Sequence, residues 1–310
     1  NGEIYNYQTL RQELVDEGYP FFSHSDTEVI LALYSRDGKK MLDRINGQFA
    51  FAIWDKTNES LFIARDRIGK KPLYYHRINN DIVFASELKA LLCLEQIPRN
   101  IRLDAVHDFF AYQYIPDPKT IFENIYKLEP GHYLEIDKNG ISKHQYWDIS
   151  FSQQSQSSEA QLKTELQAMI KQCTTSRMIS DVPLGAFLSG GVDSSGIVAT
   201  MSKNSEQPIT TCSIGFDTKQ FNETEFAQQV ARQYHTEHHE YIVHENVKDN
   251  LKKIVSYFDE PFADPSLVPT YFVSQLARQK VTVAIAGDGG DEVFAGYEKY
   301  SIDHIENKLR

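Results

Sequence analysis

Two apolar spacings alternate along the first half of the chain. Apolar residues recur at helical intervals over 9–17 and 27–34, and Ser25 with Asp26 can cap the second of these helices. Strand-like segments bounded by polar turns are predicted at 47–54, 60–66, 73–77, 82–86 and 132–136, with helices among them at 86–92 and 104–112. This order predicts an α+β domain built on antiparallel sheets over residues 1–149.

The second half has a different pattern. Residues 150–158 read Ser-Phe-Ser-Gln-Gln-Ser-Gln-Ser-Ser, and we expect a linker over 150–159. Beyond it, strands are predicted at 184–188, 209–215, 238–242 and 281–286, and helices at 160–174, 195–203, 223–235, 247–258, 266–278 and 297–310. Alternating strands and helices predict an α/β domain with a Rossmann-like parallel sheet over 160–310.

Charge and cysteine content narrow the class of protein. The 310 residues carry a net charge of −11 with scattered lysines and arginines, which argues against a nucleic-acid partner. No apolar run approaches the roughly 18 residues of a membrane-spanning helix, so we expect no membrane partner. Cys93, Cys173 and Cys212 show no paired spacing. We therefore expect neither disulfides nor a zinc site, and predict a cytoplasmic protein.

A glycine- and serine-rich loop, Ser189 to Ser195, directly follows the apolar residues 186–188 and precedes a helical segment. Two glycines let the backbone approach an anion, and the N–H groups of the loop and of the next helix point at negative charge. Asp193 can hold the Mg²⁺ that accompanies ATP. A Walker lysine is absent, so the loop predicts cleavage between the α- and β-phosphates rather than γ-phosphoryl transfer.

A second glycine-rich loop follows the apolar residues 284–286. It reads Gly287-Asp288-Gly289-Gly290-Asp291-Glu292, with three carboxylates within five residues. Crowded carboxylates repel one another unless a cation lies between them. Because ligands bind at the carboxyl ends of the strands in an open parallel sheet, we expect both loops to face one site.

Two further groups of polar residues each allow a structural and a functional interpretation. His235, His238 and His239 lack regular ligand spacing, which favours a solvated helix-to-strand connection over a metal site. The carboxylates in 259–264 (Asp259, Glu260 and Asp264) suit either helix-capping and turn roles or a substrate role.

Several motifs occur in one order along the chain. They are Asn1-Gly2-Glu3-Ile4-Tyr5-Asn6, the residues 25–28, 47–51, 65–75 and 84–89, and then 180–183, 189–195, 213–216, 259–266 and 287–297. In this order they resemble the glutamine-dependent asparagine synthetase family over essentially all 310 residues. The resemblance implies a class II glutaminase domain with an N-terminal nucleophile hydrolase-like sandwich, followed by an ATP-pyrophosphatase domain.

For the glutaminase half, the resemblance implies an oxyanion hole from the Asn1 amide and the Gly2 N–H, with Glu3 and Asp26 holding the amino group of glutamine. The family's nucleophilic cysteine lies upstream of the position of Asn1. The three cysteines present are predicted to be core or bystander residues. We therefore expect a fragment that lacks both ends of the protein and that cannot hydrolyse glutamine as written.

For the synthetase half, the resemblance implies that a carboxylate attacks the α-phosphate of ATP, forming an acyl-adenylate that ammonia then attacks. Asp288 stands where well-known members carry glutamate, and it would assist proton transfer. The implied assignments are Ser189, Gly190, Gly191 and Ser194 to pyrophosphate, Ile214 and Gly215 to adenine, Gly287 and Asp288 to the ATP site, and Asp193 and Asp291 to Mg²⁺.

These assignments favour asparagine synthesis from aspartate, with glutamine or ammonia as nitrogen donor. Two alternatives remain open: a related amidotransferase or β-lactam-type synthetase acting on another carboxylate, and a non-catalytic interaction protein that keeps the fold. The presence of Asp193 and Asp291 argues against the second. The expected ligands are ATP, Mg²⁺, glutamine and aspartate, and the sequence leaves a homodimer open.

Overall fold

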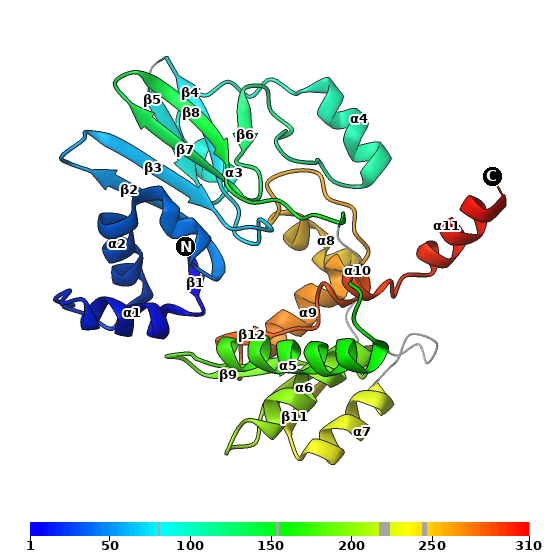
Figure 1. Ribbon diagram of the computed structural model, residues 1–310. Coiled ribbons are helices and arrows are strands. Elements are labelled where there is room, and N and C mark those ends of the chain that lie inside the picture. Colours follow the sequence, from blue (N-terminus) through cyan, green and yellow to red (C-terminus); the bar gives the residue numbers. More distant parts are fainter. Residues whose placement is uncertain (80, 153–154, 217–223, 244–246, 310) are drawn as a thin grey trace. The chain divides into compact units, whose positions relative to one another are not determined.

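The structure of the chain, a computed structural model, describes all residues except 80, 153–154, 217–223, 244–246 and 310 (Figure 1). Part of the predicted linker, one residue of the turn at 78–81 and the first residue of the predicted helix 223–235 therefore lie outside the described residues. Contacts within the chain define two compact units. The first comprises residues 1–155 and 255–264, and the second 156–254 and 265–310.

The first unit contains two antiparallel sheets. Five strands pair in the order β1 (Gly2–Ile4), β2 (Gly47–Asp55), β3 (Ser60–Arg65), β7 (His132–Asp137) and β8 (Gly140–Gln145). Three pair in the order β5 (Asp81–Ala85), β4 (Tyr74–Ile78) and β6 (Ile125–Lys127). The helices are α1 (Tyr7–Asp16), α2 (Asp26–Asp37), the 3₁₀ helix η1 (Gly38–Asp43), α3 (Leu88–Leu91) and α4 (Leu103–Tyr112).

Alternating side chains arrange these elements in four layers. On β3, Phe62 packs with Leu14 and Leu33 of α1 and α2. The next residue, Ile63, points to the opposite face, as successive residues of a strand do, and packs in the cluster that includes Tyr75 of the smaller sheet. A third cluster joins that sheet to α3 and α4. The predicted α+β sandwich is thus confirmed, with helices outside and the two sheets inside.

The second unit is built on a parallel sheet in the order β11 (Glu237–Val243), β10 (Thr210–Phe216), β9 (Leu184–Phe187) and β12 (Val283–Ile285). Its helices are α5 (Glu159–Arg177), α6 (Val192–Lys203), α7 (Thr224–Tyr234), α8 (Val247–Val255), α9 (Leu267–Ala277), α10 (Gly290–Phe294) and α11 (Glu298–Leu309).

Helices cover both faces of this parallel sheet. Ala186 of β9 packs with Val198 of α6 and Ala227 of α7, whereas Phe187, the next residue, packs with Ala277 of α9. The predicted α/β domain is therefore confirmed. No helix in the described part of the chain combines the length and apolar character needed to cross a membrane.

Five elements were absent from the sequence prediction: β1, η1, β6, β8 and α10. The strands β1 and β6 have three residues each, too few for a period to be recognised. Strand β8 is a polar edge strand that pairs only with β7. Helix α8 ends at Val255 instead of the expected residue 258, because the residues that follow pack in the first unit.

Candidate functional site

The loop after β9 is held in one shape by its glycines and serines. Gly190 has a φ of +91°, and a Cβ at this position would lie 2.6 Å from both Cβ of Phe226 and the Ala227 nitrogen. The hydroxyls of Ser189 and Ser194 are 2.9 Å apart, and the Gly191 N–H donates to Ser189 Oγ over 3.3 Å. Helix α6 starts at once, with Gly191 as its N-cap. The loop therefore presents N–H groups and hydroxyls at a helix N-terminus, which suits a phosphate group.

The acidic loop after β12 lies directly against this loop. A Cβ placed on Gly290 would be 2.5 Å from Cγ of Asp193, and one placed on Gly287 would be 3.0 Å from Cβ of Asp193. Only glycine allows so close an approach. The two loops line a cavity of about 340 Å³. Its wall contains Ser189, Asp193, Ser194, Gly287, Asp288 and Asp291. The structure thus brings most residues of the predicted ATP site to one place.

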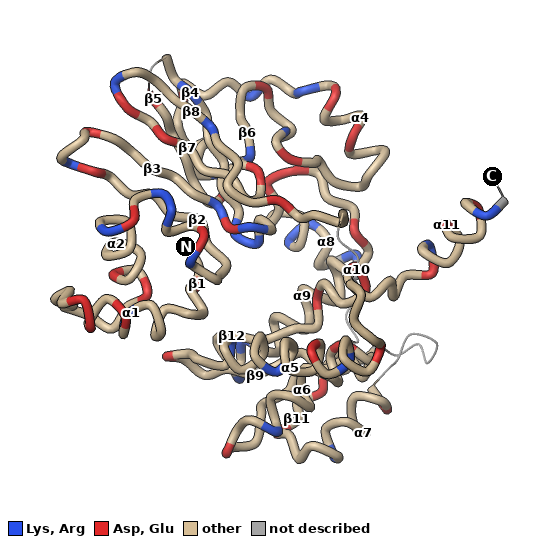
Figure 2. Tube along the Cα trace, in the orientation of Figure 1, with Lys and Arg blue, Asp and Glu red and all other residues tan. Residues whose placement is uncertain are grey.

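Charges in this cavity are predominantly negative. Among the described residues, no lysine or arginine forms an ion pair with Asp193, Asp288 or Asp291. Lysine and arginine positions occur along many elements of both units (Figure 2). Glu292 differs, because it accepts a hydrogen bond from the Tyr297 hydroxyl at 2.8 Å, which lowers the pKa of its carboxyl.

Asp193 and Asp291 fit a Mg²⁺ ion that travels with a nucleotide. Mg²⁺ is usually bound by one or two carboxylates together with phosphate oxygens, and it keeps several waters. The described residues hold no group of three or more histidine, cysteine or acidic side chains that could bind a metal without such help.

The predicted adenine contacts lie beside this cavity rather than in its wall. Ile214 and Gly215 form the carboxyl end of β10, next to β9, and neither lines the cavity. Phe187 and Tyr297 line it, and the sequence had given no reason to select either.

A second pocket, of about 260 Å³, lies in the first unit. Asn1, Gly2, Glu3 and Asp26 all line it, together with apolar residues that include Phe49. Gly2 has a φ of +139°, and a Cβ there would be 2.1 Å from the Gln48 carbonyl oxygen, so only glycine fits between β1 and β2. The four residues predicted to bind glutamine are therefore neighbours.

Hydrogen bonds fix the orientation of two of these side chains. Asp26 Oδ2 accepts the Ile4 N–H at 3.0 Å, and Ser25 caps helix α2 by accepting the Thr27 N–H at 3.1 Å. The Asn1 amide nitrogen donates to Ser86 Oγ at 3.4 Å. Ser86 had been noted only as part of a family motif, because 85 residues separate it from Asn1.

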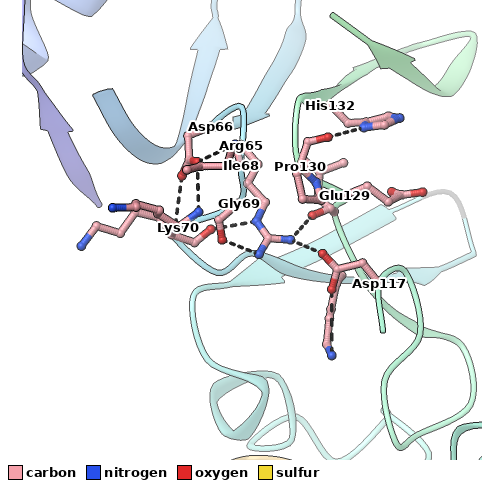
Figure 3. A network of polar contacts seen from close by, with 12 residues as sticks. Arg65, Asp66, Ile68, Gly69, Lys70, Asp117, Glu129, Pro130 and His132 are labelled. Atoms are coloured by element: carbon pink, nitrogen blue, oxygen red, sulfur yellow. Dashed lines mark hydrogen bonds and ion pairs between the residues drawn. The ribbon is translucent and has the colours of Figure 1, made fainter. Parts of the chain in front are cut away.

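Hydrogen bonds within residues 65–71 hold this segment in one conformation (Figure 3). The buried Asp66 carboxylate accepts the N–H groups of Phe49, Ile68, Lys70 and Lys71 at distances of 2.9 to 3.2 Å. The Asp66 N–H in turn donates to the Phe49 carbonyl at 2.8 Å. Because Phe49 lines the pocket, Asp66 fixes one of the pocket's walls.

One prediction about a polar cluster needs correction. His238 is not in a solvated connection: it is partly buried between Thr211 Oγ1 at 2.9 Å and Ser213 Oγ at 3.2 Å, and burial lowers the pKa of its imidazole. Cys173 lies in α5 and is exposed. Cys212 is buried in β10, where burial raises the pKa of its thiol.

Asp259 serves the N-terminus of a helix, because its Oδ2 accepts the Lys89 N–H in the first turn of α3 at 3.2 Å, and both Asp259 and Glu260 form ion pairs. Asp259 Oδ1 is 3.1 Å from Lys89 Nζ, and Glu260 Oε1 is 2.7 Å from Lys127 Nζ. Both partners belong to the same compact unit as residues 255–264. Sequence reasoning missed these ion pairs because each spans more than 130 residues.

Comparison with known proteins agrees with this arrangement. A family model described as a glutamine amidotransferase domain matches residues 1–147, and one described as asparagine synthase matches residues 165–310. The chain belongs to the glutamine-hydrolysing asparagine synthetase family. The resemblance deduced from the motifs is thereby confirmed.

Individual members show how far the likeness extends. The chain is 40% identical to asparagine synthetase [glutamine-hydrolyzing] 1 of Bacillus subtilis over 97% of its own length and 47% of that protein. It is 41% identical to a putative asparagine synthetase of Methanocaldococcus jannaschii over 96% of its length and 58% of that protein. A relative named amidase chry2, from Gibberella zeae, is 30% identical over 98% of the chain and 48% of that protein. The chain spans about half the length of the curated relatives it matches.

Proposed function

We propose that this chain belongs to an enzyme that makes asparagine from aspartate with glutamine or ammonia as nitrogen donor, through a β-aspartyl-adenylate and with release of AMP and pyrophosphate. The observation that supports this proposal most strongly is the close contact, at Asp193, between the loop after β9 and the loop after β12 in the second unit. A cavity that combines phosphate-binding groups with carboxylates that no described lysine or arginine pairs with suits a nucleotide with its metal.

In this proposal the predicted site residues have separate roles. The N–H groups and hydroxyls of residues 189–194 hold the leaving pyrophosphate. Asp193 and Asp291 hold Mg²⁺, which supplies charge neutralisation at the phosphates when bound. Asp288 holds or passes a proton near the reacting carbonyl. Ile214 and Gly215 at the end of β10 stay assigned to adenine as a prediction.

The pocket of the first unit would bind glutamine. Glu3 and Asp26 present carboxylates suited to an ammonium group, and the Asn1 amide with the Gly2 N–H presents donors for an oxyanion. Its volume of about 260 Å³ suits a small amino acid. A cytoplasmic location and a homodimer stay as predictions from the sequence.

Calorimetric titration of the 310-residue chain with Mg·ATP tests the nucleotide site. Asp193→Asn and Asp291→Asn should each weaken binding at least tenfold, because each removes charge that helps to neutralise the metal. The double variant should be weaker than either single by far less than the product of their effects, since the two carboxylates serve one ion. Glu123→Gln, at an exposed position of the first unit, is the matched control. Wild-type affinity in either single variant would contradict the shared metal.

Product analysis tests the reaction in a complete protein that carries this chain. With aspartate, ammonia and Mg·ATP, we expect AMP and pyrophosphate, and ¹⁸O from the aspartate carboxylate should appear in AMP. Supplying ammonia directly makes the result independent of glutamine hydrolysis. Formation of ADP and orthophosphate would refute the mechanism.

One observation, the aspartate at position 288, favours a carboxylic acid other than aspartate as the substrate. Aspartate is one methylene shorter than glutamate, so its carboxylate reaches less far into the cavity that it lines. A panel of other carboxylic acids, including peptide and sugar acids, in the same AMP assay separates the two substrate classes. Turnover with one of these and none with aspartate would move the protein to the alternative class.

A further inference from the structure

The wall of the nucleotide cavity contains one carboxylate to which the proposed function gives no role. Glu292 lies in α10 and lines the cavity, and Tyr297 lines it too. The Tyr297 hydroxyl donates to Glu292 Oε1 at 2.8 Å. The two side chains therefore form a fixed polar pair in the same wall as the residues assigned to phosphate and Mg²⁺.

The turn after α10 brings this pair together. Ala295 ends the helix in the left-handed conformation, with a φ of 57° and a ψ of 43°, which residues other than glycine seldom adopt. The Gly296 N–H then donates to the Asp291 carbonyl at 2.9 Å, and a Cβ on Gly296 would collide with Asp291 Oδ1. The chain thus turns back tightly over α10, so that the Tyr297 hydroxyl reaches the Glu292 carboxylate.

A cationic side chain lies next to the pair. Lys299 Nζ is 5.4 Å from the centre of the Tyr297 ring and 5.4 Å from that of the Tyr300 ring. The centres of these two rings are 6.0 Å apart. In the part of the chain that the structure describes, neither Glu292 nor Lys299 forms an ion pair. A carboxylate and an ammonium group therefore lie beside one tyrosine ring, and neither charge is neutralised by an ion pair.

The order of the strands leaves this part of the wall to the acceptor. The sheet runs β11, β10, β9, β12, so β10 and β12 lie on opposite sides of β9. The proposed function assigns adenine to the end of β10 and pyrophosphate to the loop after β9. Glu292 and Tyr297 follow β12 instead. They belong to the part of the wall that remains for the carboxylic acid that attacks the α-phosphate.

We propose that Glu292 and Lys299 determine the class of acceptor by binding the head group of an α-amino acid, Glu292 its ammonium group and Lys299 its α-carboxylate. Hydrogen bonds between groups of opposite charge are the strong ones, and a lysine can donate three of them. Tyr297 is a positioning residue that holds Glu292. This inference rests on the proposed function for the reaction. It adds that the acceptor carries both charges at the end remote from its reacting carboxylate.

Three acids with the same reacting end test the head-group site in a complete protein that carries this chain. Aspartate has both head-group charges, succinate lacks the ammonium group, and β-alanine lacks the α-carboxylate. AMP formation with ammonia and Mg·ATP gives kcat/KM for each acid. We expect the wild type to favour aspartate over either analogue by at least about a hundredfold, because a site built to hydrogen-bond a substrate group rejects an analogue without it.

Each variant should change one preference and keep the other. In Glu292→Gln the aspartate-to-succinate ratio should fall at least about tenfold, the effect of one lost hydrogen bond between charged groups, and the aspartate-to-β-alanine ratio should stay within about twofold of wild type. Lys299→Gln should give the reverse pattern. Tyr297→Phe keeps the ring and loses the hydroxyl, so it should lower only the aspartate-to-succinate ratio, by about threefold.

Controls separate this pattern from a general loss of structure. Glu298→Gln and Lys308→Gln make the same substitutions at exposed positions of α11 outside the cavity wall and should keep both ratios. A misfolded variant would lower kcat/KM for all three acids together. Calorimetric titration of each acid into protein saturated with magnesium and α,β-methylene-ATP, which cannot be cleaved at this position, should give the same ratios as dissociation constants.

The outcomes distinguish the inference from the proposed function. Equal kcat/KM for the three acids in the wild type would refute the head-group site and leave the proposed reaction standing. Unchanged ratios in Glu292→Gln or in Lys299→Gln would refute the role of that residue. No AMP from any carboxylic acid would refute the proposed function. The calorimetric ratios then decide the inference, and equal binding of the three acids would refute it as well.

Discussion

The two units of this molecule treat buried and clustered charge in opposite ways. In the first, the charges of Arg65, Asp117, Lys127 and Glu260 are joined to partners of opposite sign at distances of 2.7 to 4.0 Å. In the second, Asp193, Asp288 and Asp291 line one cavity, and no described cationic side chain pairs with them. Paired charges hold a structure in one conformation. Like charges without partners repel one another, so they favour binding of a cation that arrives with a ligand.

The largest effect should come from removing a buried carboxylate of the first unit that accepts several backbone hydrogen bonds. Asp66→Ala leaves four backbone N–H groups without their acceptor, and we expect it to lower the free energy of unfolding by about 4 kcal/mol. Both tryptophans, Trp54 and Trp147, lie in the first unit, so their fluorescence in urea titrations reports its unfolding. The control Asp81→Ala changes an exposed aspartate and should have little effect. Equal midpoints for the two variants would contradict the role given to Asp66.

The next effect concerns the backbone of the phosphate loop in the second unit. Gly190→Ala combines a positive φ with a clash against α7 and should cost about 3 kcal/mol. Gly289→Ala is a matched control, because Gly289 has nearly the same φ, +92°, but open space around its Cβ, and it should cost only about 1 kcal/mol. Hydrogen exchange in α6 measures both. Equal costs would show that the close packing on Phe226 is unimportant.

A smaller effect of opposite sign is expected at the unpaired carboxylates. Without ligand, Asp193→Asn should leave the second unit as stable as before or more stable by about 0.5 kcal/mol, because it relieves repulsion among the acidic residues. The same variant should bind Mg·ATP more weakly. Hydrogen exchange in α6 of the unliganded chain measures the stability. A loss of more than about 1 kcal/mol would indicate that Asp193 is a structural residue, like the paired carboxylates of the first unit.

The smallest expected effect is the pH dependence due to His238. Burial holds the pKa of this imidazole below its ordinary value near 6.5, so the unfolded chain binds a proton more readily than the folded one. The stability of the second unit should therefore be complete above pH 6.5 and fall as the pH is lowered towards the folded pKa. The charged and titratable neighbours Glu240 and His239 act in opposite directions on this pKa. His238→Gln should flatten the dependence, and an unchanged profile would assign it to other groups.

Local patterns predicted much of the fold and of the candidate sites. The spacing of apolar residues located α1, α2, the main strands of both sheets and the parallel order of the second unit. The two glycine-rich loops were recognised because each of their key residues lies within a few positions of a strand end. The proposed glutamine contacts came from the family resemblance, and the structure brings them together.

The features that escaped prediction depend on residues far apart in the chain. Ser86 reaches Asn1, and Glu260 reaches Lys127, across 85 and 133 positions, respectively. A period of two or 3.6 residues carries no information at such separations. His238 was misjudged because its neighbours Thr211 and Ser213 belong to a different strand, so its burial could not be seen in the run 235–239.

Residues 255–264, which we call the crossing segment, pack in the first unit although the chain on either side of them belongs to the second. This segment restricts how the protein can be recombined with its relatives. A chimaera joined once, near residue 155, would pair the first unit of one parent with a crossing segment from the other. Lys89, Lys127 and Ile121, which donate to the carboxylates of this segment, would then meet foreign carboxylates or none. An exchange that also carries residues 255–264 keeps each set of partners together. The segment that must be exchanged as a whole is therefore discontinuous in sequence.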